Sequence, residues 1–166
     1  MWLVYTVELY TSYNLGDFGI YPRDVKGLIG VFAAPLLHGN VNHLMSNTIP
    51  LLVLGAALYF FYPRLASRVF LYSYFFTNML VWIFGRPYIH IGASGLVYGL
   101  ASFLFFFGIF KRNSKSVLIS LGVLLIYGGM VYGIMPSNGW VSWESHLMGA
   151  VVGLVASFLL SRKLNY

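Results

Sequence analysis

The sequence predicts an all-α polytopic membrane protein, built as a single helical bundle. Hydrophobic residues make up 59% of its 166 residues and charged residues only 8%, whereas soluble proteins average about 45–50% apolar and 25% charged. The apolar residues form runs long enough for membrane helices, separated by short gaps that contain Gly, Pro or charged residues. The absence of cysteine excludes disulfides, a thiol nucleophile and a cysteine-bound metal.

The first segment is too short to cross a bilayer. Residues 1–10 are apolar, but a crossing needs about 20 residues, and a longer helix would carry Glu8 and Asp17 into lipid. We therefore expect a partial first helix. Residues 11–42 follow as a long connection rich in turn residues, and its apolar middle, 28–37, predicts a loop that lies at the membrane interface.

Five further apolar runs predict helices. Pro63 ends the first of them, and Pro50 inside it is tolerated in a membrane because neighbouring groups can satisfy the freed carbonyl. Gly85 and Pro87 stop the second run. With the partial helix these give six helices in one domain over residues 1–166. The expected helices cover residues 43–62, 69–84, 94–110, 117–135 and 145–161.

The basic residues predict the orientation of the bundle. If successive helices alternate in direction, seven Lys and Arg residues lie on one side and three on the other, and the positive-inside rule places the seven in the cytoplasm. Trp140 and Trp143 suit an aromatic belt at the outer surface. The net charge of +6 is then explained by topology, and no nucleic acid is expected as a partner. The seven are Arg64, Arg68, Lys111, Arg112, Lys115, Arg162 and Lys163; the three are Arg23, Lys26 and Arg86.

Ser94 is the candidate nucleophile. It lies in Gly92-Ala93-Ser94-Gly95, where an apolar helix should begin. A serine hydroxyl attacks a carbonyl only if a base takes its proton and donors receive the charge that develops on oxygen. Gly92 and Gly95 leave backbone amides uncovered, and amides at a helix start lack intrahelical partners, so the amides around Ser94 can hold an oxyanion. The motif alone is more typical of packed membrane helices.

His146 is the candidate general base. The second, fourth and sixth helices all begin on the outer side, so its first-turn position matches the depth of the nucleophile. Gly149 and Gly153 follow it on the sixth helix, and Gly95 and Gly99 have the same spacing on the fourth. Small residues at this spacing let two helices approach closely, as a hydrogen bond of about 2.6–3.2 Å between them requires.

His43 and Asn47 are candidate oxyanion donors, because residues four apart lie on one face of the second helix. The alternative is that they only join helices by hydrogen bonds. Glu144 is expected in the loop before the sixth helix and on another face, so the sequence predicts a Ser-His dyad without an acidic third member. Tyr98, one turn after the nucleophile, is expected to pack beneath a histidine ring.

Two histidines remain. His38, at the end of the interfacial loop, is expected to make a structural hydrogen bond. His90, in the loop before the fourth helix, receives no role.

Together these motifs resemble the rhomboid intramembrane serine proteases, from about residue 30 to residue 160. The resemblance implies that Ser94 is the nucleophile, that His146 is the general base, and that His43, Asn47 and the Ser94 amide stabilise the oxyanion. It also implies cleavage of transmembrane helices of single-span substrates near their outer ends, without metal or cofactor. The matching motifs are His38-x-x-x-x-His43-x-x-x-Asn47, Gly92-Ala93-Ser94-Gly95 with Tyr98, and His146-x-x-Gly149-x-x-x-Gly153.

The resemblance further implies that substrate arrives laterally from the lipid bilayer, past the fifth helix and a cap formed by residues 136–145. We expect the bacterial plasma membrane, with the site toward its outer side. Three features depart from the family. The Trp-Arg pair of the first loop is replaced at Gly30-Val31-Phe32, the acidic residue of the second helix is replaced near Tyr59, and the first helix is incomplete.

Three alternatives to a protease stay open. The first is a catalytically inactive rhomboid-like scaffold that binds client transmembrane helices. The second is a metal enzyme that uses His38, His43 and His146, although the His-Glu-x-x-His signature is missing. The third is a transporter, for which paired broken helices and intramembrane carboxylates are lacking in the sequence.

Overall fold

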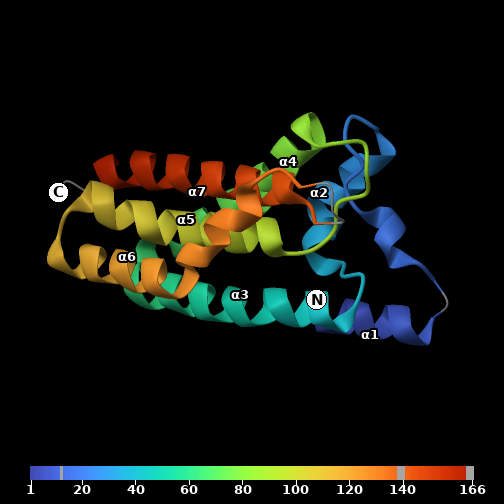
Figure 1. The fold of residues 1–166 in the computed structure, drawn as a ribbon, viewed down its shortest axis with the longest axis horizontal. Helices are drawn as coiled ribbons and strands as arrows, with labels where there is room; N and C mark the ends of the chain where they lie inside the picture. Colours follow the sequence, from blue (N-terminus) through green and yellow to red (C-terminus); the bar gives the residue numbers. More distant parts are fainter. Residues whose placement is uncertain (12, 138–140, 164–166) are drawn as a thin grey trace.

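The computed structural model describes residues 1–11, 13–137 and 141–163, and within these ranges the chain forms helices and loops but no β-strand (Figure 1). The predicted all-α class is confirmed. The six expected helices are present as α1 and α3 to α7, and a short α2 lies in the loop between α1 and α3. The α-helices are α1 (Trp2–Tyr10), α2 (Gly30–Ala33), α3 (Val41–Phe61), α4 (Pro63–Phe84), α5 (Ser94–Lys111), α6 (Ser114–Tyr127) and α7 (Trp143–Lys163); the 3₁₀ helices are η1 (Leu15–Phe18), η2 (Lys26–Ile29), η3 (Ala34–Leu36) and η4 (Gly128–Ile134).

Helix α4 begins at Pro63 rather than at residue 69. Proline is well suited to the first helical position, because its missing N–H would have no partner there. It therefore starts a new helix directly after Tyr62 instead of only ending the preceding one. Helix α7 begins at Trp143, so that Glu144, which was expected in the loop, lies in its first turn.

The fifth predicted helix is divided into two parts. The side chain of Asn113 accepts a hydrogen bond from the Ser116 amide at 2.8 Å and caps the start of α6. The α-helix ends at Tyr127, and the chain continues as the 3₁₀ helix η4. Residues 128 and 129 are both glycine, which weakens the α-helix at this point.

Four helices of the described chain are long and apolar enough to cross a membrane. They are Val41–Phe61, Ser94–Lys111, Ser114–Ile134, which joins α6 to η4, and Trp143–Arg162. Helix α4 is as long as these but is not among them, because its first turns contain Arg64 and Arg68 and its middle contains hydroxyl and amide side chains. The chain is an integral membrane protein.

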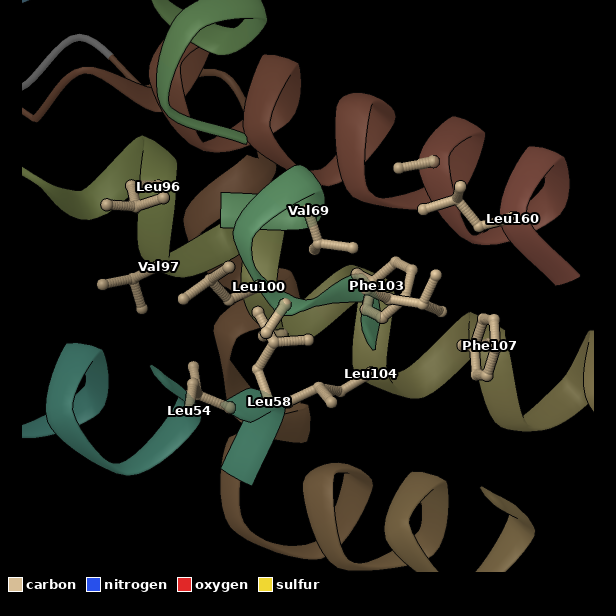
Figure 2. Packing of buried hydrophobic residues seen from close by; sticks show 14 residues of the cluster. Leu54, Leu58, Val69, Leu96, Val97, Leu100, Phe103, Leu104, Phe107 and Leu160 are labelled. Carbon is tan, nitrogen blue, oxygen red and sulfur yellow. The ribbon is translucent and has the colours of Figure 1, made fainter. Parts of the chain in front are cut away.

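The core lies around α5 (Figures 1 and 2). Helix α5 runs between α7 and α6, and its Leu100, Phe103, Leu104 and Phe107 are fully buried. The surrounding helices complete the cluster, with side chains such as Leu58 of α3. In contrast, only 6% of the residues in the membrane segment of α6 and η4 are buried. The bundle therefore holds α5 rigidly and leaves α6 at its edge.

Side chains of α4 fix the interfacial loop. Asn78 Nδ2 donates to the Val31 carbonyl at 3.0 Å, and Tyr74 Oη donates to the Phe32 carbonyl at 2.5 Å. Trp82 Nε1 donates to the Asp24 carbonyl at 2.9 Å. These bonds anchor the stretch in which the Trp-Arg pair of the family is absent.

Candidate active site

The side chains of Ser94 and His146 are in direct contact. The Ser94 Oγ lies 2.9 Å from the His146 Nε2, within hydrogen-bond distance. Ser94 is the first residue of α5, and Gly92, two residues earlier, has a φ of +107°, which L residues other than glycine rarely adopt. His146 lies in the first turn of α7 and is buried. The spatial contact predicted from the sequence is therefore present.

Glycines bring α5 and α7 close enough for this contact. A Cβ atom added to Gly149 would overlap the Gly95 carbonyl oxygen, and one added to Gly153 would overlap the Gly99 carbonyl oxygen. In both cases the obstacle is backbone, which cannot rotate away. The helix pair can reach its present separation only with glycine at these positions.

The second ring nitrogen of His146 also has a partner. Its Nδ1 lies 2.9 Å from the Gly133 carbonyl oxygen in η4. The Tyr98 ring stacks on the imidazole with centroids 4.2 Å apart and planes 7° from parallel, which confirms the predicted packing. Tyr98 Oη donates to the Met130 carbonyl oxygen at 2.8 Å. No side-chain pattern points to Gly133, because only its backbone is involved.

His43 and Asn47 face the same cavity as the serine. The cavity has a volume of about 730 Å³, and its walls include His43, Asn47, Ser94, Tyr98 and His146. Asn40 caps α3 by accepting from the His43 amide at 2.8 Å, which fixes the helix start. A Cβ on Gly92 would lie 2.6 Å from the His43 Nε2, so this imidazole reaches the loop that leads to Ser94.

Asn47 is already partly engaged. Its Nδ2 donates to the His43 carbonyl oxygen at 2.8 Å, and the residue is only 3% exposed. An amide nitrogen carries two hydrogens. One therefore remains for an oxyanion, and the bond to its own helix fixes the side-chain orientation.

The structural hydrogen bond expected for His38 is not fully formed. The residue is 2% exposed and neither ring nitrogen has a hydrogen-bond partner of full geometry within the described residues, although the Leu36 backbone lies close enough to oppose the fall in its pKa. Its ring lies 4.9 Å, centroid to centroid, from that of His43. Burial and the neighbouring His43 lower the pKa of His38 to about 4, so that its imidazole is neutral at pH 7.

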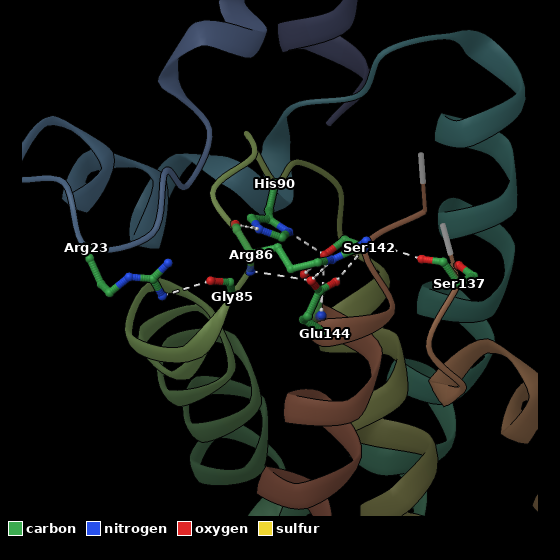
Figure 3. Close-up of polar contacts among 8 residues, drawn as sticks. Arg23, Gly85, Arg86, His90, Ser137, Ser142 and Glu144 are labelled. Carbon is green, nitrogen blue, oxygen red and sulfur yellow. Dashed lines mark hydrogen bonds and ion pairs between the residues drawn. The ribbon is translucent and has the colours of Figure 1, made fainter. Parts of the chain in front are cut away.

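Glu144 is part of a polar cluster that the sequence did not predict (Figure 3). It is 2% exposed and forms an ion pair with Arg86, whose guanidinium also donates to the Ser137 carbonyl at 3.2 Å. The hydrogen bond to Glu144 raises the pKa of Arg86. His90, which received no role, is buried, and its Nδ1 lies 2.5 Å from the Ser142 Oγ.

This cluster joins the loop between α4 and α5 to the start of α7. It also holds residue 137, at the edge of the expected cap. Residues 138–140, including the expected interfacial Trp140, lie outside the described residues. Within the described chain, no three His, Cys, Asp or Glu side chains gather closely enough to hold a metal ion. His38, His43 and His146 therefore do not form such a group.

Comparison with known proteins identifies the family. The model of the Rhomboid domain matches residues 26–163, most of the chain. The chain belongs to the rhomboid family. An uncharacterized protein of Mycobacterium tuberculosis is 42% identical over 97% of this chain and 71% of its own length, and one of Mycobacterium leprae is 41% identical over 97% and 68%. RHOMBOID-like protein 4 of Arabidopsis thaliana is 30% identical over 78% of this rhomboid chain and 33% of its own length.

Proposed function

We propose that this rhomboid-family protein is an intramembrane serine endopeptidase that cleaves single-span transmembrane segments near their outer ends. The observation that carries the proposal is the 2.9 Å contact between the Ser94 Oγ and the His146 Nε2 in the wall of the cavity. Such a pair is costly at membrane depth and has the geometry of a nucleophile with its base.

In the proposed reaction, Ser94 Oγ attacks the scissile carbonyl while His146 Nε2 takes its proton. The carbonyl oxygen becomes negatively charged, and the side chains of His43 and Asn47 with the Ser94 amide stabilise it. The C–N bond then breaks, and His146 returns the proton to the leaving amine. Water attacks the resulting ester with His146 again as base, which releases the acid and restores the hydroxyl.

The substrate must unwind locally before it can be cut, because the carbonyls of an intact helix are hydrogen-bonded and covered by side chains. Segments with Gly or Pro near the outer surface are therefore favoured. We propose lateral access past α6, the most exposed of the helices long enough to cross the membrane. The balance of basic residues supports a site toward the outer side of a bacterial plasma membrane.

The test is cleavage of a panel of single-span substrates by the purified protein in proteoliposomes. Ser94→Ala and His146→Ala should each abolish cleavage while the protein stays folded by circular dichroism. Ser157→Ala is the matched control, because within the described part of the chain that hydroxyl bonds the Leu154 carbonyl of its own helix at 2.6 Å and no group of the cavity. Full activity in either dyad variant would refute the dyad.

An inactive scaffold is the second candidate, since the family match alone does not establish activity. It predicts that Ser94 is not reactive and that client helices bind without being cut. A fluorophosphonate probe separates the two functions. Labelling at Ser94 that disappears in His146→Ala supports the protease, and absence of labelling in the wild type supports the scaffold.

A further inference from the structure

The 3₁₀ helix η4 accepts hydrogen bonds from Tyr98 and His146, the two residues whose rings stack next to Ser94. We propose that η4 is the positioning element of the general base: the Gly133 carbonyl fixes the tautomer of His146, and the Met130 carbonyl fixes the tyrosine on which it stacks. Because η4 continues α6, movement of α6 would then control the reactivity of the serine. This inference rests on the proposed function and names two backbone groups for the same site.

The hydrogen-bond chemistry determines which nitrogen carries the proton. A neutral imidazole has one N–H donor and one acceptor nitrogen. A carbonyl oxygen can only accept, so the 2.9 Å contact with Gly133 requires the proton on His146 Nδ1. Nε2 is then the acceptor and faces the Ser94 Oγ at 2.9 Å. This is the tautomer that a general base needs, and in serine proteases with a triad a carboxylate selects it.

The sequence around η4 leaves the Gly133 carbonyl available. In a 3₁₀ helix a carbonyl accepts from the amide three residues later. Three residues after Gly133 is Pro136, which has no N–H. The carbonyl therefore lacks this backbone donor, and the imidazole supplies one.

Helix α6 is attached differently at its two ends. At the end away from the dyad it packs tightly, since a Cβ on Gly108 would overlap the Ser116 carbonyl and Ser120 Oγ donates to the Phe105 carbonyl. At the dyad end, the side-chain hydrogen bonds described for η4 are those from Tyr98 and His146. Displacement of this end would break both bonds and release the imidazole, so cleavage requires η4 to be in place once the substrate has entered past α6.

The chain offers a matched pair of glycines in η4 to test this. A Cβ on Gly133 would overlap the Tyr98 Oη and would lie 3.2 Å from the His146 Nδ1, whereas a Cβ on Gly129 meets nothing within 4 Å. Gly133→Ala therefore pushes the two rings off the carbonyls, and Gly129→Ala makes the same chemical change in the same element without contact.

The first measurement is the rate at which a fluorophosphonate probe labels Ser94, because a small probe reacts without a substrate helix having to pass α6. We expect Gly129→Ala to label like the wild type and Gly133→Ala to label about 10²-fold more slowly, the lower end of what a general base contributes. Adding Tyr98→Phe to Gly133→Ala removes the overlapped oxygen and should restore part of the rate.

The second measurement is the ¹⁵N spectrum of histidine-labelled protein, with His146 assigned through His146→Gln. We expect Nδ1–H with an unprotonated Nε2 in the wild type and in Gly129→Ala, and a mixture of tautomers in Gly133→Ala. A merely structural defect would not change the tautomer. If Gly133→Ala fails to fold, Tyr98→Phe alone, which removes the bond to Met130 without overlap, should slow labelling several-fold.

A folded Gly133→Ala with the wild-type labelling rate and the wild-type tautomer would overturn the inference, as would an unchanged rate in Tyr98→Phe. Failure of the proposed function looks different. In that case the wild type itself does not label at Ser94, and the tautomer of its His146 still shows whether Gly133 positions the ring.

Discussion

The contact between α5 and α7 can be tested by adding a single methyl group. Gly149 lies three residues after His146, about one turn along α7, and faces the backbone of α5. In Gly149→Ala the new Cβ would lie more than 1 Å closer to the Gly95 carbonyl oxygen than the ordinary contact distance of 3.4 Å. Neither backbone can rotate away, so the two helices must separate at this level.

A separation of about 1 Å lengthens the bond between Ser94 Oγ and His146 Nε2 from 2.9 Å to beyond hydrogen-bond range. Misplacement of catalytic groups by this distance costs roughly 10²-fold in rate. Overpacking also destabilises a protein by about 1–3 kcal/mol. We therefore expect Gly149→Ala to remain folded with a lower unfolding midpoint, and to label with fluorophosphonate about 100-fold more slowly.

Gly122→Ala is the control, because it places a methyl group on a membrane helix where nothing lies within 4 Å. It should label at the wild-type rate. Labelling and unfolding midpoints are measured side by side in the same detergent. A Gly149→Ala protein that labels as fast as Gly122→Ala would show that the dyad does not depend on close helix packing, and the reasoning would fail.

Three further predictions concern the surroundings of the dyad. Arg86→Ala should lower the unfolding midpoint more than Glu144→Gln. Arg86→Ala leaves the buried Glu144 carboxylate without its cation, whereas in Glu144→Gln the partly exposed Arg86 can be rehydrated. A larger effect of Glu144→Gln would contradict this. Lowering the pH from 6.5 towards 4 should reduce the free energy of unfolding by at most about 3 kcal/mol through His38, because the unfolded chain binds a proton there and the buried ring, with its pKa of about 4, does not. In His38→Leu the unfolding midpoint should decrease less with falling pH. An equal decrease would exclude His38 as the origin. Gly92→Ala should abolish labelling, because φ at this position is +107° and the new Cβ would press on His43; normal labelling would show that the loop tolerates a side chain.

The meeting of Ser94 and His146 could be predicted because two simple constraints determine it. Alternating membrane helices place both residues at the same depth, and glycines spaced by four on both helices permit close approach. Membrane helices have few other ways to bury such a polar pair. For the same reason the stacking of Tyr98, one turn from the serine, could be predicted from spacing alone.

The second partner of His146 could not be predicted, because a backbone carbonyl leaves no mark in side-chain identity. The available signal was indirect: two adjacent glycines that end α6, then Gly133 three residues before a proline. The position of Glu144 differs from the prediction for another reason. The apolar pattern places the start of α7 at residue 145, but Ser142, whose Oγ lies 3.4 Å from the Ser145 amide, is of the type that caps a helix, and α7 begins at Trp143.

The interfacial loop is held by side chains of α4 that bind its backbone. The carbonyls of the loop residues Val31 and Phe32 accept from Asn78 and Tyr74 of α4. Such bonds depend on the path of the loop backbone, which local sequence does not specify. They place the loop against α4, and the Ala34 carbonyl then accepts from the Gly92 amide at 2.8 Å.

That last bond links the interfacial loop to the segment that leads to Ser94. Gly92 precedes Ser94 by two residues, so this turn is held from one side by the loop and from the other by His90, which bonds Ser142 at 2.5 Å. The start of α7 is tied to the same segment through the ion pair between Arg86 and Glu144. Ser94 and His146 are thus held relative to each other by polar contacts at and beside the cavity wall and by the glycine packing of α5 against α7. Among the described elements around the site, η4 is the one that continues the mostly exposed α6, and it is held by the bonds from Tyr98 and His146, so any control over the proposed reaction should act there.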